Sequence, residues 1–323
     1  MSYSMNTAIY AVLIAFVANI ALCPILIPSL IKLKFGQYVR NDGPSSHLKK
    51  TGTPTMGGIM IIISFLLAGF VFMRDNPQAT AIIGATAAFG FLGFLDDFII
   101  ITKKRSLGLR AYQKFLGQIV ISIIFLMYWR TLPGYSTEIL IPFFPDMTFD
   151  VGLLFPAFAM LVFLSCTNGA NLTDGLDGLA AGVTALIAAF FMFAAWIIES
   201  PVLPVTGAAV GSLLGFLWFN SHPAKVFMGN TGSLALGGFV AAVALMMRMP
   251  LFLLIVAIIY VMETMSVIIQ VGYFRMTKLR FFKMAPIHHA FELSGWPETK
   301  VVSFFYVITA MACLLGYLAL QGV

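Results

Sequence analysis

The feature that most constrains the fold is a series of long apolar runs separated by short polar segments. A helix needs roughly 17–25 mostly apolar residues to cross the hydrocarbon core of a bilayer. Ten runs reach this length and predict ten membrane-spanning helices, at about 7–31, 56–73, 79–101, 112–131, 151–167, 178–198, 203–219, 232–248, 250–274 and 301–320. The runs 151–167 and 203–219 are short or glycine-rich, so they are the candidates for a broken span.

Composition supports the same fold class. Hydrophobic residues make up 60% of the chain and charged residues only 10%, which excludes an ordinary soluble domain. We therefore expect an all-α polytopic membrane protein, with residues 1–323 forming a single transmembrane domain.

The basic residues predict the orientation. With ten spans, sixteen of the nineteen lysines and arginines fall on one side of the membrane. Since cytoplasmic loops carry the excess of basic residues, that side is expected to be cytoplasmic and both termini to lie outside. The opposite side carries the loop 132–150, whose alternating apolar residues predict a short hairpin.

One polar stretch, 168–178, lies between two apolar runs on the expected cytoplasmic side. Asn168, Asn171, Asp174 and Asp177 recur at every third position. Carboxylates are costly beside lipid, so they must face water, protein or a ligand. The interspersed glycines favour a loop running into a helix start, with backbone free to approach a ligand. The alternative is a polar connecting loop with turn glycines.

Four further segments on this side carry polar groups. Asp96 and Asp97 are followed by a basic cluster, which suits phosphate and a divalent cation; the alternative is two acids at a helix end. Segment 227–233 predicts a glycine-rich turn into a helix N-terminus, which can bind an oxyanion or be an ordinary cap. His288 and His289 suit phosphate binding, proton transfer or metal ligation, or are solvated loop residues. Lys50 suits anionic oxygens or lipid headgroups.

Together these segments favour phosphoryl transfer at the membrane surface, with Mg²⁺ neutralising phosphates. A transporter is the competing class, and transporters place charges within their spans and repeat their halves. Here Glu263 is the main charge inside a span and no clear repeat is visible. The sequence therefore favours an enzyme.

Five motifs resemble those of the polyprenyl-phosphate N-acetylhexosamine-1-phosphate transferases. They are G-F-L-D-D-F at 93–98, N-G-A-N-L-T-D-G-L-D-G at 168–178, F-M-G-N-T-G-S-L-A-L-G-G at 227–238, G-T-P-T-M-G-G at 52–58 and A-P-I-H-H-A-F-E-L-S-G-W at 285–296. The last two resemble the phospho-N-acetylmuramoyl-pentapeptide transferase branch. The resemblance covers nearly the whole chain.

The resemblance implies a reaction at a bacterial plasma membrane. Undecaprenyl phosphate would attack the β-phosphate of UDP-N-acetylmuramoyl-pentapeptide, giving lipid I and UMP with Mg²⁺ as cofactor. Nucleic acid is not an expected partner, and a homodimer is compatible with a sequence that does not determine oligomeric state. The alternatives are an N-acetylglucosamine-1-phosphate transferase and, in another class, a lipid transporter.

The resemblance also assigns residues. The catalytic set is Asp96, Asp97, Asn230 and His288, and the metal set is Asn230, Asp174 and Asp177. Phe227 would stack on uracil with Asn220 nearby, and Asn168, Asn171, Asp174 and Asp177 would form the nucleotide site. Lys50, Thr55, Lys104, Lys114, Gln270 and His289 would line the rest of the substrate pocket.

The chain departs from the family pattern at two positions. Asn230 stands where the family has an aspartate that ligates Mg²⁺, and Ala290 stands where it has a third histidine. An amide offers one neutral oxygen and lacks the charge that a hard cation prefers. We expect a chain that folds and binds nucleotide but turns over weakly, unless Asp174 or Asp177 carries more of the metal binding.

Overall fold

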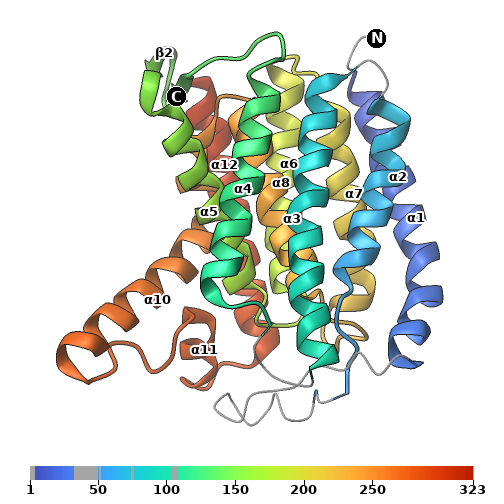
Figure 1. Cartoon of the computed structure of the whole chain (residues 1–323), viewed down its shortest axis with the longest axis vertical. Helices are drawn as coiled ribbons and strands as arrows, with labels where there is room; N and C mark the ends of the chain where they lie inside the picture. The colour runs from blue at the N-terminus through green and yellow to red at the C-terminus, as the bar shows by residue number, and fades with distance from the viewer. Residues whose placement is uncertain (1–3, 33–49, 51, 74–75, 104–107, 323) are drawn as a thin grey trace.

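The computed structural model describes residues 4–32, 50, 52–73, 76–103 and 108–322. The helices are α1 (Met5–Lys32), α2 (Gly58–Met73), α3 (Pro77–Thr102), α4 (Ala111–Trp129), α5 (Phe155–Thr173), α6 (Leu179–Ile197), α7 (Leu203–Asn220), α8 (Gly229–Met246), α9 (Leu253–Val256), α10 (Ile258–Thr277), α11 (Ile287–Glu292) and α12 (Glu298–Gln321). Two 3₁₀ turns, η2 (Gly152–Leu154) and η3 (Pro250–Phe252), precede α5 and α9. The chain is thus an all-α bundle, as predicted (Figure 1).

Each of the ten predicted spans corresponds to a helix or a helix pair. Within the described residues, eight helices are long and apolar enough to cross a membrane by themselves, and α2 is a shorter apolar helix. The predicted span over 250–274 corresponds to two helical segments separated by a bend. Residues 250–256 and α10 meet at an angle of 83°, and α10 leans away from the bundle (Figure 1). The runs 151–167 and 203–219, named as candidates for a break, each correspond to one unbroken candidate span, Gly152–Thr173 and Leu203–Asn220.

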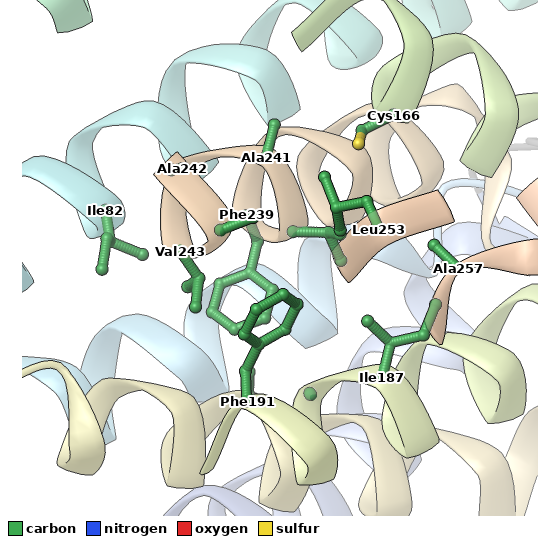
Figure 2. Packing of buried hydrophobic residues seen from close by; sticks show 14 of the residues in the cluster. Ile82, Cys166, Ile187, Phe191, Phe239, Ala241, Ala242, Val243, Leu253 and Ala257 are labelled. Carbon is green, nitrogen blue, oxygen red and sulfur yellow. The ribbon is translucent and has the colours of Figure 1, made fainter. Parts of the chain in front are cut away.

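The centre of the bundle is α8. In its apolar 18-residue stretch 89% is buried, whereas in that of the peripheral α1 only 22% is buried. Its many glycines and alanines allow neighbouring backbones to approach closely. A Cβ on Gly237 would lie 2.4 Å from the Cα of Thr167 on α5. Figure 2 shows Phe239 from α8 and Phe191 from α6 among the buried residues of this core. The close approach at Gly237 fixes the position of α8 against α5.

The predicted hairpin is present, with β1 (Glu138–Ile141) antiparallel to β2 (Phe144–Asp150). It is anchored to the bundle by Arg248, which bonds both the backbone oxygen and the carboxylate of Glu138. The start of α1 and the end of α12 lie at this end of the molecule, whereas α11 lies at the other (Figure 1). The polar motifs gather at the α11 end.

Candidate functional site

The site begins at the first turn of α8, whose backbone N–H groups have no partners within their own helix. Asp97, from α3, supplies the acceptors. Its Oδ1 accepts from the backbone N of Asn230 at 3.1 Å, and its Oδ2 accepts from the N and Oγ1 of Thr231 at 2.8 and 2.7 Å. A carboxylate at a helix N-terminus is also favoured by the helix dipole. Asp97 therefore caps α8 from a neighbouring helix.

Close packing of α3 on α8 places this cap. A Cβ on Gly93 would lie only 2.1 Å from the backbone oxygen of Asn230, so no other residue fits there without moving α8. Gly93 lies one turn before Asp97 on the same face of α3. The G-F-L-D-D-F motif thus combines a close-approach position with the capping carboxylate.

Asn230 connects Asp97 to α5. Its Nδ2 donates to Asp97 Oδ1 at 2.9 Å, and its Oδ1 accepts from Asn171 Nδ2 at 2.7 Å. Asn171 Nδ2 also lies 2.8 Å from Ser233 Oγ. Asp97 therefore accepts four hydrogen bonds, two on each oxygen. The amide of Asn230 presents a donor to the acid and keeps its oxygen turned toward α5.

Asp174 completes this first cluster, immediately after α5 ends. Its carboxylate accepts from the backbone N–H of Gly229, at the start of α8. The pKa of Asp174 is raised to about 7, because burial, together with the negative charges of Asp97 and Asp177, outweighs the lowering by the Gly229 bond. Among the described residues Asp174 forms no ion pair. It is the acid of this cluster whose charge is least compensated.

Asp177 points into a second cluster. Its Oδ1 lies 2.7 Å from Lys50 Nζ, which also lies 2.6 Å from Glu298 Oε1. His222 Nδ1 is 3.1 Å from Asp177 Oδ2. Asp177, His222 and Glu298 have ligand atoms within 4.8 Å of one another and so could hold a metal ion. Lys50 already supplies a cation between two of them.

The turn 174–178 joins the two clusters, and its glycines are needed for contacts within the protein. Gly178 has φ of +80°, and its N–H donates to Oδ1 of the buried Asn220. A Cβ on Gly175 would lie 2.1 Å from His288 Nε2. The space beside Gly175 and Gly178, where a ligand was expected to approach, is thus filled by other groups of the protein. The loop prediction was wrong for Asn168 and Asn171, which lie in α5.

His288 is fully buried under this turn. Its Nδ1 lies 3.0 Å from Oε1 of the equally buried Glu263, on α10. The other oxygen of Glu263 accepts from the backbone N of Ile287, at the start of α11, at 2.9 Å. His289, whose ring centre is 4.1 Å from that of His288, pairs with Glu292 at 2.8 Å.

Asp96 points away from Asp97, toward α4. Its Oδ2 is 2.8 Å from Lys114 Nζ, and its Oδ1 accepts from the backbone N of Leu109 at 2.6 Å. The two adjacent acids therefore serve different partners: Asp96 binds the start of α4, and Asp97 binds the start of α8. Neighbouring positions on a helix point about 100° apart, which explains the division.

The remaining predicted residues are spread around these clusters. Thr55 is buried beside Gly229, and Phe227 is half-buried with its backbone paired to Pro54 and Gly57. Asn168 bonds Gln118 of α4. Gln270 accepts from the backbone N of Phe282. Lys104 lies outside the described residues.

Comparison with known sequences decides the family. Residues 79–248 match the profile described as Glycosyl transferase family 4. Proteins named phospho-N-acetylmuramoyl-pentapeptide-transferase are 49% identical over 96% of this chain in Clostridioides difficile and 48% identical over 98% in Clostridium novyi; these matches cover 97% and 98% of the relatives. A third, from Acetivibrio thermocellus, is 47% identical over 99% of this chain and 97% of its own length. The chain belongs to the phospho-N-acetylmuramoyl-pentapeptide-transferase family. It is therefore a bacterial membrane enzyme, a transferase, as predicted.

Several residues of the transferase site were not predicted. Glu298 and His222 complete the Lys50 cluster, and Glu263 holds His288. The sequence does single out Glu263, because it is a charged residue inside an apolar run. It does not single out Glu298, since this residue precedes the last span and pairs with a lysine 248 positions away.

Proposed function

We propose that this transferase moves phospho-N-acetylmuramoyl-pentapeptide from its UDP conjugate to undecaprenyl phosphate, releasing UMP and forming lipid I. The observation that carries the proposal is the convergence of Asp97, Asn230, Asn171 and Asp174 at the start of α8, in a chain of this family. An acceptor phosphate oxygen forms a bond to the β-phosphorus of the donor. The bond from that phosphorus to the bridging oxygen breaks, and UMP leaves with the electron pair.

A phosphate monoester at neutral pH is already an anion, so the acceptor needs positioning more than deprotonation. Asp97 is poorly suited to act as a base, because both its oxygens are occupied by donors from α8. Its role in our proposal is to fix the first turn of α8. The polar side chains around that turn are then held in fixed positions, preorganised for the phosphate oxygens of the substrate.

Mg²⁺ fits one part of this site. Burial and the neighbouring charge of Asp97 raise the pKa of Asp174, and hard divalent cations prefer such carboxylate oxygens. We propose that Asp174 holds the ion, with the negative charge of Asp97 beside it, and the ion would neutralise diphosphate oxygens when bound. The predicted ligand Asn230 turns a donor toward Asp97, and Asp177 is paired with Lys50.

Lys50 belongs to the second cluster, and Lys114 lies beside Asp96. Each is already paired with a carboxylate, at 2.7 and 2.8 Å. We propose that they orient the acids that surround the substrate and attract its phosphates. We also propose that this end of the bundle faces the cytoplasm, because the segments there carry most of the basic residues.

The test is UMP release by the purified protein in detergent, with UDP-N-acetylmuramoyl-pentapeptide and undecaprenyl phosphate, in Mg²⁺ or in EDTA. We expect UMP in Mg²⁺ and its loss in EDTA. Release with UDP-N-acetylglucosamine in place of the muramoyl donor would assign the other sugar. No release with either donor, while the protein remains folded, would contradict the proposal.

A further inference from the structure

Glu263 is the one acidic residue placed well inside an apolar run of the sequence, and the proposed reaction leaves it without a role. In the structure its side chain is fully buried, as is that of His288. A buried carboxylate is costly unless it is paired and hydrogen-bonded. Glu263 meets both conditions: Oε1 faces His288 Nδ1 at 3.0 Å and Oε2 accepts from Ile287 N at 2.9 Å.

The pair leaves the two ring nitrogens of His288 in different situations. A carboxylate can only accept, so Nδ1 carries the proton of this hydrogen bond. Nε2 is buried and has no partner within the described part of the chain. It faces Gly175, inside the turn that carries Asp174 and Asp177. An unpartnered buried polar atom needs an explanation, and a functional role is one of them.

The backbone bond to Ile287 makes this arrangement rigid. It ties the first residue of α11 to α10, so one carboxylate sets both the position of the short helix and the rotation of the ring next to it. Without it, the ring could rotate or change tautomer, and Nε2 would no longer be the nitrogen presented to the turn. The same logic orients histidines in many sites, where a carboxylate holds one nitrogen so that the other can act.

We infer that Glu263 is a positioning residue for the transfer reaction: it holds His288 so that Nε2 is presented to the 174–178 turn, where the diphosphate of the donor is handled. The inference rests on the proposed function. Glu263 itself touches no substrate, and it acts through His288. Nε2 is the group that would donate to a phosphate oxygen of the donor, with both ring nitrogens protonated, once that turn adjusts to bind it.

The test is a double-mutant cycle on UMP release with Glu263→Leu, His288→Ala and the double variant. Loss of a group that orients a functional side chain typically lowers activity by about 10–100-fold. We expect Glu263→Leu to lower kcat within that range, with little change in the KM for the nucleotide donor. In the His288→Ala background the same substitution should change kcat by less than about threefold, because residues that act as a unit are not additive. Glu263→Gln keeps an acceptor and should lie between the wild type and Glu263→Leu.

Thr264→Val is the matched control. Thr264 is the next residue on α10, and its Oγ1 has no partner among the described residues, so the change removes no hydrogen bond. It should leave kcat within about twofold of the wild type, an effect as small as that of most substitutions outside such features. Equal losses in Thr264→Val and Glu263→Leu would show a packing effect and overturn the inference. So would additive losses in the cycle.

A second measurement separates this inference from the proposed function. The imidazole ¹⁵N and ¹H signals of ¹⁵N-histidine-labelled protein, with His288 assigned through His288→Gln, report which ring nitrogen is protonated. We expect a hydrogen-bonded Nδ1–H in the wild type and Thr264→Val, and its loss in Glu263→Leu. If the wild type releases no UMP, the proposed function fails, and the positioning role then stands or falls on these signals. An unchanged His288 ring in Glu263→Leu would overturn it.

Discussion

Replacing Asn230 by aspartate is the change with the sharpest expected consequence. The amide Nδ2 lies 2.9 Å from Asp97 Oδ1, so the substitution exchanges a donor for a second negative oxygen at the same place. Two unit charges about 3 Å apart repel by roughly 5 kcal/mol at an effective dielectric constant of about 20. Proton uptake by one acid relieves part of this repulsion, and we expect a net destabilisation of about 2–4 kcal/mol without metal.

A divalent cation reverses the sign of this effect. Mg²⁺ between the two carboxylates turns their repulsion into a binding site with one more charged ligand than the wild type has. At a concentration 100 times its dissociation constant, a ligand that binds only the folded state stabilises it by about 2.7 kcal/mol. Asn230→Asp should therefore be less stable than the wild type in EDTA and recover most of that loss in Mg²⁺, with a sharp rise in UMP release.

The assay is thermal unfolding followed by tryptophan fluorescence in detergent, in EDTA and in Mg²⁺, beside UMP release. Asn230→Ala is the control, because it loses the same amide bonds without adding a charge. It should be destabilised by about 1–3 kcal/mol in both conditions. A melting temperature of Asn230→Asp that is the same in EDTA and in Mg²⁺, with activity equal to that of the wild type, would refute the reasoning.

Three further predictions use matched pairs or conditions. Gly93→Ala should lower the melting temperature by several degrees and abolish UMP release, because its Cβ would lie 2.1 Å from a carbonyl oxygen of α8. Gly84→Ala is the control on the same helix: no described atom lies within 4 Å of its added Cβ, so the melting temperature should be unchanged or slightly higher. Lys50→Ala should cost about 3 kcal/mol in chemical unfolding, since it leaves two largely buried acids facing each other, whereas Lys300→Ala, which removes a cation from the face of a tryptophan ring, should cost less than about 1 kcal/mol. The pKa of Asp174 in the folded protein is about 7, above its ordinary 3.8. In EDTA, its contribution to the free energy of unfolding is therefore full below about pH 4 and is lost as the pH rises through about 7. Asp174→Asn should make the melting temperature depend less on pH between about pH 5 and 8.

The membrane spans were predictable because bilayer thickness sets a length that apolar runs must meet. The break between η3–α9 and α10 was not. Residues 250–274 are mostly apolar and contain no proline or glycine near Ala257 to mark a bend. The bend arises where Ala257 leaves helical geometry, with φ of −102° and ψ of 30°. A span that crosses and a span that bends away can therefore have the same composition.

The site was predictable as a set of motifs and less so as a set of contacts. Family resemblance assigned Asp97, Asn171, Asp174 and Asn230 to the active site in different roles, and the structure brings these four together at the start of α8. The separation of Asp174 from Asp177 was not foreseen. A three-residue spacing puts two side chains near one another only if the helix continues, and α5 ends at Thr173.

The three acids of the site differ in how well their negative charge is compensated, and this difference indicates which of them depends most on a bound cation. Asp97 is satisfied by four donors from α8, and Asp177 by Lys50 together with two weaker partners. Asp174 has one backbone donor and the repulsion of both other acids. A bound diphosphate would add negative charge beside Asp174, so the electrostatic repulsion that opposes binding of the donor and the acceptor would act mainly at this residue. Compared with an aspartate, the amide at position 230 removes one negative charge from the first cluster. This change reduces repulsion among the acids when Mg²⁺ is absent, and it weakens the attraction for the ion when the substrate binds.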